Sequence, residues 1–259
     1  MTKTVLITGA SSGIGKEFAK IFSKKGFNVI LVARSEEKLG KIKDYLTQKY
    51  ENNVVYYVKD LTAENAVKEL YDEVKSDGYP VDYLINNAGF GSNHGYIETD
   101  YEVHENMVKL NVLSLMELCH CFGKDMCERK SGKILNVASI AAFSAGPYMS
   151  VYYATKAFVL SLSEALSEEF SEYGVSVTCL CPGPTETNFG AVSDFGESNA
   201  FRYLGVAKAS DVAKIGYKAM MKEKSLVFSG FKVKFMAFLT RITPRSINTS
   251  FSKFMNKHK

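Results

Sequence analysis

A glycine-rich segment near the start of the chain constrains the fold most strongly. Residues 5–7 form an apolar run typical of a buried strand, and a helical pattern begins after Gly15 and ends at Gly26. Glycines at such a turn let the backbone approach a pyrophosphate, and the helix N-terminus offers unpaired N–H groups. The segment therefore predicts a dinucleotide-binding unit. The expected contacts are Gly9, Ser11, Ser12, Gly13, Ile14 and Gly15.

Strand-like runs and amphipathic helical stretches alternate along the chain. Further strands are expected at 28–32, 54–58, 81–85, 133–138 and 175–180, and helices at 36–49, 63–76, 101–129 and 152–173. Such alternation predicts a parallel sheet covered by helices on both faces. With 259 residues, 46% of them apolar, the chain fits one sizeable domain.

A candidate catalytic group follows the strand at 133–138. Tyr152 and Lys156 are four residues apart on a predicted helix and so share a face. A nearby ammonium favours the phenolate, so Lys156 is expected to lower the pKa of Tyr152. Ser139 would hold a substrate carbonyl or alkoxide against the Tyr152 proton. An isolated pair at this spacing is often an ordinary surface pair, so the hypothesis depends on the nucleotide-binding segment upstream.

The ends of the second and third predicted strands concern the adenosine half of a dinucleotide. NAD sites usually place an acidic residue after the second strand, whereas this chain has Arg34, which could meet a 2′-phosphate. We therefore expect NADP(H) rather than NAD, the alternative being that Arg34 is an unpaired surface side chain. Asp60 and Leu61 follow the third strand and are expected near the adenine.

Asn111 lies inside the predicted helix at 101–129, although asparagine is a mediocre helix former. One interpretation is a polar residue that caps a local backbone defect. The other places Asn111 near Lys156, where it would hold a water that carries protons to solvent.

These segments together resemble the short-chain dehydrogenase/reductase family over roughly residues 4–230. The shared pieces are Thr8-Gly9-x-x-x-Gly13-x-Gly15, Asp60, Asn86-Asn87-Ala88-Gly89, Asn111, Ser139, Tyr152-x-x-x-Lys156 and Pro182-Gly183. The resemblance implies an α/β three-layer Rossmann fold with a seven-stranded parallel sheet in a single domain. It also implies subunit contacts through the helices at 101–129 and 152–173, and so a homodimer or homotetramer.

The resemblance also implies roles for individual residues. Tyr152 would be the general acid/base and Ser139 would bind the substrate oxygen, while Lys156 would hold the nicotinamide ribose and Asn111 would serve the proton relay. Some NADP-preferring members have a basic residue where this chain has Ser12, which leaves Arg34 as the main basic candidate. The remaining implied cofactor contacts are Asn87, Ala88, Gly89, Pro182, Gly183, Thr185 and Thr187.

The substrate region is expected at residues 188–208, which place several aromatic side chains among glycine and serine. This composition resembles the mobile substrate lid of family members. With Phe143, Pro147, Tyr148 and Met149 nearby, the pocket should favour an apolar small-molecule carbonyl or alcohol. The alternative is that these aromatic side chains pack only against one another.

The segment 231–259 differs from the catalytic domain expected at 1–230. It holds seven Lys/Arg and no Asp/Glu, so the net charge of +4 arises from this segment. Its apolar residues follow helical spacing, which predicts a basic amphipathic extension. Such a helix lies on an anionic membrane surface, over the substrate cleft or against a second subunit. Nucleic-acid binding is not expected, because Phe and Met interrupt the basic residues and no recognition motif accompanies them.

The remaining composition bears on location and chemistry. Five cysteines are an odd number, and two pairs are too close in sequence for ordinary disulfides, which favours a reduced, intracellular protein. Four scattered histidines offer no metal-ligand spacing. No leader or membrane-spanning run is evident, so a cytoplasmic protein is expected, at most peripheral to a membrane. The competing function is a non-catalytic dinucleotide-binding sensor or scaffold.

Overall fold

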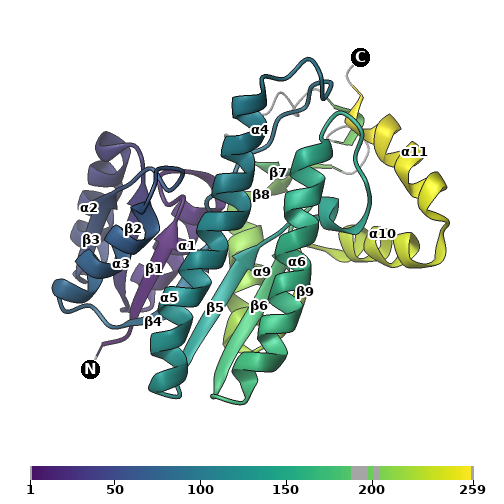
Figure 1. Cartoon of the computed structure of the whole chain (residues 1–259). Helices are drawn as coiled ribbons and strands as arrows, with labels where there is room; N and C mark the ends of the chain where they lie inside the picture. Colours follow the sequence, from purple (N-terminus) through teal and green to yellow (C-terminus); the bar gives the residue numbers. More distant parts are fainter. Residues whose placement is uncertain (1, 188–197, 201–204, 258–259) are drawn as a thin grey trace.

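A seven-stranded, wholly parallel sheet forms the centre of the computed structural model, which describes residues 2–187, 198–200 and 205–257 (Figure 1). The strand order is β3-β2-β1-β4-β5-β6-β9, which confirms the expected Rossmann topology. Two short strands, β7 and β8, pair separately. The strands are β1 (Thr4–Thr8), β2 (Asn28–Ala33), β3 (Val54–Val58), β4 (Val81–Asn86), β5 (Gly132–Val137), β6 (Val175–Cys181), β7 (Thr185–Glu186), β8 (Ala207–Lys208) and β9 (Leu226–Phe228).

Helices cover both faces of the sheet. Buried side chains of α3, α5 and α6 pack on one face, and those of α1, α2 and α9 pack on the other. The helices are α1 (Gly13–Lys24), α2 (Glu36–Tyr50), α3 (Ala66–Ser76), α4 (Tyr101–Val108), α5 (Leu115–Glu128), α6 (Ser150–Ser171), α9 (Ala209–Met221), α10 (Phe231–Ile242) and α11 (Arg245–Asn256), with a 3-10 turn, η2 (Ile140–Phe143).

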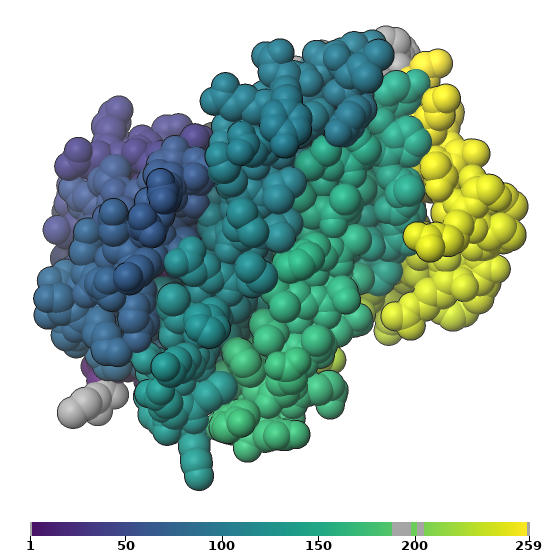
Figure 2. Space-filling model, viewed as in Figure 1, coloured from purple at the N-terminus to yellow at the C-terminus, as the bar shows by residue number. Residues whose placement is uncertain are grey.

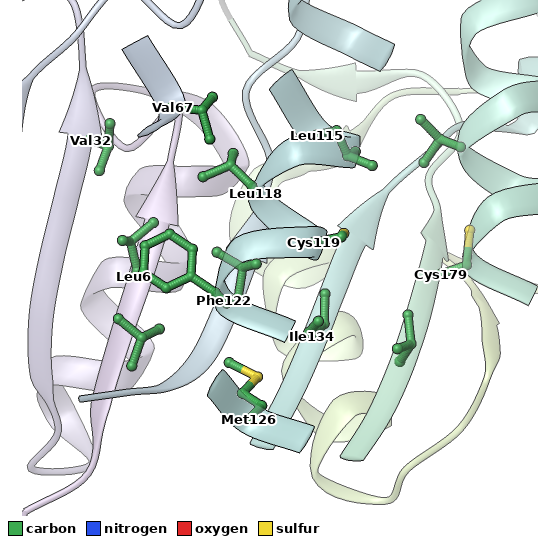
Figure 3. Packing of buried hydrophobic residues seen from close by; sticks show 14 of the residues in the cluster. Leu6, Val32, Val67, Leu115, Leu118, Cys119, Phe122, Met126, Ile134 and Cys179 are labelled. Atoms are coloured by element: carbon green, nitrogen blue, oxygen red, sulfur yellow. The ribbon is translucent and has the colours of Figure 1, made fainter. Parts of the chain in front are cut away.

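The position of β1 at the centre of the sheet explains why its sequence is continuously apolar. Val5 and Ile7 belong to one core cluster and Leu6 to the other, and all three are fully buried. A strand buried on both faces needs no polar alternation. Figure 3 shows Leu6 facing Leu118 and Phe122 of α5 across one of these interfaces. The two cores hold the sheet between its helical layers.

The helix expected at 101–129 is interrupted. Between α4 and α5 the chain makes a π-helical turn, η1 (Lys109–Ser114), which contains Asn111. The Ser114 hydroxyl donates to the Lys109 carbonyl at 2.8 Å, which satisfies a backbone acceptor in this wide turn. A polar residue inside the predicted helix therefore marked a real backbone irregularity.

The C-terminal helices α10 and α11 lie on one flank of the molecule (Figure 1). In the space-filling view they form a separate lobe beside the rest of the chain (Figure 2). Across the described parts of the chain, we find no helix with the length and apolar character needed to cross a bilayer.

Candidate active site

The glycine turn lies at the carboxyl end of β1, where the chain neighbours β2 on one side and β4 on the other. Gly9 and Gly13 have φ values of 63° and 53°, a left-handed conformation that favours glycine. A Cβ on Gly15 would lie 2.6 Å from the Asn87 amide nitrogen, and one on Gly13 would lie 2.9 Å from Thr187. Only glycine fits this closely packed turn.

Thr8 joins the ends of β1 and β4. Its hydroxyl accepts hydrogen bonds from the backbone N–H groups of Asn87 and Ala88, both at 3.0 Å. The Asn87 amide donates in return to the Thr8 carbonyl at 3.0 Å. This reciprocal bonding fixes the two strand ends that form the floor of the site.

Tyr152 and Lys156 project from the first turns of α6 toward the end of β5. The Lys156 ammonium donates to the Val137 carbonyl at 2.9 Å and lies 5.7 Å from the centre of the Tyr152 ring. Ser139 follows β5, and its hydroxyl accepts from the Ala141 N–H at 3.1 Å. The three predicted side chains are buried and lie together.

The ionisation of this group differs from the expectation. Burial raises the pKa of Tyr152 well above its usual range, and the hydrogen bond with Ser139 opposes this only in part. Burial also lowers the pKa of Lys156 to about 8. The expected lowering of the Tyr152 pKa by Lys156 is wrong for this structure, because desolvation of the phenol raises the pKa more than the Ser139 hydrogen bond lowers it.

Asn111 lies behind the site and joins three segments. Its amide donates to the Phe90 carbonyl at 2.8 Å and to the Thr155 hydroxyl at 3.1 Å, and its oxygen accepts from the Phe90 N–H. A Cβ on Gly89 would contact both the Asn111 oxygen and the Lys156 ammonium. Asn111 therefore fixes the loop after β4 against α6, next to Lys156.

One cleft of about 750 Å³ contains nearly every residue predicted from the sequence. Gly15 and Asn111 are the two that do not line it, since Gly15 supports Gly9 from behind and Asn111 lies beneath Gly89. The predicted residues that line the cleft are Gly9, Ser11, Ser12, Gly13, Ile14, Arg34, Asp60, Leu61, Asn87, Ala88, Gly89, Ser139, Tyr152, Lys156, Pro182, Gly183, Thr185 and Thr187.

The adenosine end of the cleft is more basic than the sequence analysis recognised. Arg34 lies 3.9 Å from the Asp60 carboxylate and keeps 77% of its side chain exposed. Lys38 and Lys59 line the same cleft. Lys59 forms ion pairs with two glutamates of α3, whereas Lys38 forms none with any residue the structure describes. Lys38 lies in the first turn of α2, four residues after Arg34, and a second basic residue so soon after the end of β2 is the signal that could have identified it.

The other end of the cleft is apolar and is closed by the C-terminal helices. Of the four residues expected there, Met149 lines the cleft, whereas Phe143 packs against Phe228 with ring centres 5.5 Å apart. The predicted lid falls largely outside the described residues. The C-terminal segment packs over the cleft, which is one of the three placements expected from its sequence. Its lining residues come from α10, α11 and the turn between them: Met236, Leu239, Thr240, Thr243, Ile247, Asn248, Phe251, Ser252 and Met255.

The turn before α1 fits the pyrophosphate of a nicotinamide dinucleotide. Glycine positions that cannot accept a Cβ leave the backbone bare, and the Ser12 side chain does not cap the first turn of α1. The N–H groups of that turn are thus available to an anion.

Comparison with known proteins identifies the family of the chain. A family model described as short chain dehydrogenase matches residues 3–195. An uncharacterized oxidoreductase of Staphylococcus saprophyticus is 30% identical over 80% of this chain and 89% of its own. Mouse 17-beta-hydroxysteroid dehydrogenase type 3 is 34% identical over 70% of this chain, which spans only 60% of the mouse enzyme.

Solved structures agree with the fold. A short-chain dehydrogenase from Sphingobium yanoikuyae in complex with NADPH is 27% identical, with a TM-score of 0.83 over 93% of both chains. A short-chain dehydrogenase/reductase from Burkholderia phymatum in complex with NAD is 25% identical, with a TM-score of 0.81 over 92% of both. The chain belongs to the short-chain dehydrogenase family of nicotinamide-dependent oxidoreductases.

Proposed function

We propose that the protein is an NADP(H)-dependent oxidoreductase that interconverts a carbonyl and an alcohol on an apolar substrate. The observation that carries the proposal is that one cleft is lined both by Tyr152 and Ser139 and by the glycine turn. A bound nicotinamide dinucleotide supplies or accepts the hydride. The side chains of this protein would then manage the proton and hold the substrate oxygen.

Tyr152 is the general acid/base of this proposal. Its raised pKa keeps the phenol protonated near neutrality, which suits donation of a proton to a substrate oxygen during reduction. Ser139, hydrogen-bonded with Tyr152, would hold that oxygen in place. Lys156 would hold the nicotinamide ribose next to the carboxyl end of β5. Asn111 would support a proton path beside Lys156 in addition to fixing the Phe90 backbone. A non-catalytic sensor would need no such buried proton donor.

The preference for NADP(H) over NAD rests on the basic adenosine end. Arg34 is mostly exposed and lines the cleft, and Lys38 lines the same cleft without an ion pair to a described residue. Two cations at this position would favour a 2′-phosphate, which carries additional negative charge. The relative solved with NADPH supports this choice, although another binds NAD.

An apolar substrate follows from the lining of the other end. Met149 packs with Tyr152, and Met236, Leu239 and Met255 add apolar surface to the same cleft. The names of two relatives point the same way, since one is a hydroxysteroid dehydrogenase and a bovine one, 31% identical, is a very-long-chain 3-oxoacyl-CoA reductase. This chain spans 57% of the bovine enzyme's length. A steroid-like or long-chain carbonyl is therefore the class to test first.

The test is NADPH oxidation by the purified protein with a panel of steroid, ketoacyl, aldehyde and ketone substrates. Tyr152→Phe should lower kcat about 100-fold to 10,000-fold, because only the proton donor is lost. Tyr173→Phe, at the exposed end of α6, is the matched control and should keep full activity. Full activity of Tyr152→Phe would refute the assignment.

A further inference from the structure

The C-terminal helices carry an unusual concentration of exposed apolar side chains. Of nineteen exposed large apolar side chains among the described residues, eight lie between Phe231 and Phe254, and three of these, Leu239, Ile247 and Phe251, also line the cleft. On α10, Phe231, Phe235, Phe238 and Ile242 are 82%, 50%, 55% and 66% exposed. Their spacing of four, three and four residues places them on one side of the helix. We call these four residues the outer apolar face.

The other side of α10 packs against the rest of the protein and lines the cleft. Met236, Leu239 and Thr240 line the cleft, and Ala237 is buried. The outer apolar face therefore cannot be explained as part of the core or of the site. Its nearest aromatic neighbours are its own members, since Phe231 and Phe235 stack with ring centres 6.3 Å apart.

Cationic side chains flank the outer apolar face. Lys234 and Arg241 lie seven residues apart, on one side of it, and Lys232 lies on the other. All three are exposed, and none forms an ion pair with an acidic group in the described part of the chain. Residues 231–259 contain no Asp or Glu at all. The surface is therefore apolar at its centre and uniformly positive at its rim.

A buried amide fixes α11, the helix that follows α10, to the body of the protein. Asn256 is fully buried at the end of α11; its side-chain oxygen accepts from the Tyr153 hydroxyl at 2.9 Å, and its amide donates to the Pro147 carbonyl at 2.9 Å. The Asn93 amide donates to the backbone carbonyl of Asn256 at 2.9 Å. The helix pair is thus held at its far end, next to the cleft.

We propose that the outer apolar face binds the surface of an anionic lipid bilayer. Exposed phenylalanines at the centre suit the boundary between headgroups and acyl chains, and the cations at the rim suit anionic headgroups. A second copy of this chain is a poor occupant, because a symmetric contact would bring like charges together without any acid to neutralise them. This proposal does not rest on the proposed catalytic activity.

The experiment is co-sedimentation of the full-length protein with vesicles of phosphatidylcholine alone or mixed with phosphatidylglycerol, at low and high salt. Binding is expected only to the mixed vesicles, and salt should weaken it. Phe235→Ser with Phe238→Ser should lower the partition coefficient at least about tenfold. Lys234→Glu with Arg241→Glu should lower it at least about 30-fold. Lys222→Glu with Lys224→Glu, two exposed lysines just before β9, is the matched control and should bind like the wild type.

Three outcomes would overturn the proposal. The first is failure of the wild-type protein to bind the mixed vesicles at low salt. The second is equal binding by the phenylalanine variant, confirmed as folded by circular dichroism. The third is a smaller oligomer, measured by light scattering, for the phenylalanine variant alone, since this would identify the outer apolar face as a subunit interface.

Discussion

Arg34 is a side chain whose weak pairing leaves it free to meet a ligand. It is largely exposed and lies 3.9 Å from Asp60, a separation at which an ion pair in water contributes little. We expect Arg34→Leu to raise the Kd for NADPH about 10-fold to 100-fold, because a charge-assisted hydrogen bond to phosphate is lost. The Kd for NADH should change little. Fluorescence titration of both cofactors measures this. Lys41→Leu, on α2 but outside the cleft, is the control, and equal losses for both cofactors would contradict the proposed 2′-phosphate contact.

Lys156 is a residue whose burial makes stability depend on pH. Its pKa is about 8 in the folded protein against an ordinary 10.5, so the unfolded chain binds more protons between these values. The free energy of unfolding of the cofactor-free protein should therefore rise with pH across this window, by about 3 kcal/mol from this group. Urea unfolding of the wild type and Lys156→Met across the window isolates the contribution. Parallel pH profiles for the wild type and Lys156→Met would show that burial does not lower the pKa of Lys156 in the folded protein.

At the scale of the element, α11 depends on the amide of Asn256. Asn256→Ala removes the acceptor of the Tyr153 hydroxyl proton and the donor to the Pro147 carbonyl, so we expect a loss of about 1–3 kcal/mol in the free energy of unfolding. Hydrogen exchange in Arg245–Asn256 should also become faster.

The control for this helix is Asn199→Ala. Asn199 donates to the Phe254 carbonyl from a more exposed position, so its loss should cost less than about 0.5 kcal/mol. A double-mutant cycle of Asn256→Ala with Tyr153→Phe tests whether the two act through one hydrogen bond, in which case the losses will not add. Additive losses would mean that Tyr153 stabilises α11 through other contacts, such as its hydrogen bond with Ser252.

The elements also differ in how well the sequence predicts them. The strands around β1 and the glycine turn could be predicted because burial on both faces and a close backbone approach each demand a narrow set of residues. The cleft lining on α10 could not, because Met236 and Leu239 follow the same helical periodicity as the exposed phenylalanines. Helical periodicity shows which residues share a side of a helix, but it does not show which side packs against the rest of the protein. The Tyr152 pKa was also missed, since desolvation depends on packing that the sequence does not reveal.

At the scale of the whole molecule, apolar side chains are exposed on the outer sides of η1, α5 and α6. Leu113 in η1, Met116 on α5 and Phe158 on α6 are 48%, 42% and 37% exposed, and we predict that they lie in the subunit contact that the family resemblance implies. Leu113→Asp should therefore reduce the mass measured by light scattering after size exclusion. Ile97→Asp, at a residue 95% exposed outside these helices, should leave the mass unchanged. A monomeric wild-type protein would refute this interface.

The π-helical turn at Lys109–Ser114 has a consequence for insertions and deletions. Such a turn accommodates one residue more than the α-helix around it, so the angular positions of α4 and α5 are offset by that residue. Deletion of a single residue here would allow one continuous α-helix and would rotate its two halves by about 100° relative to each other. Met107 would then leave its buried position, or Asn111 would lose Phe90 and Thr155. A one-residue alignment gap at this helix in a related protein would therefore mark the loss of the Asn111 contacts, even where an asparagine is still present.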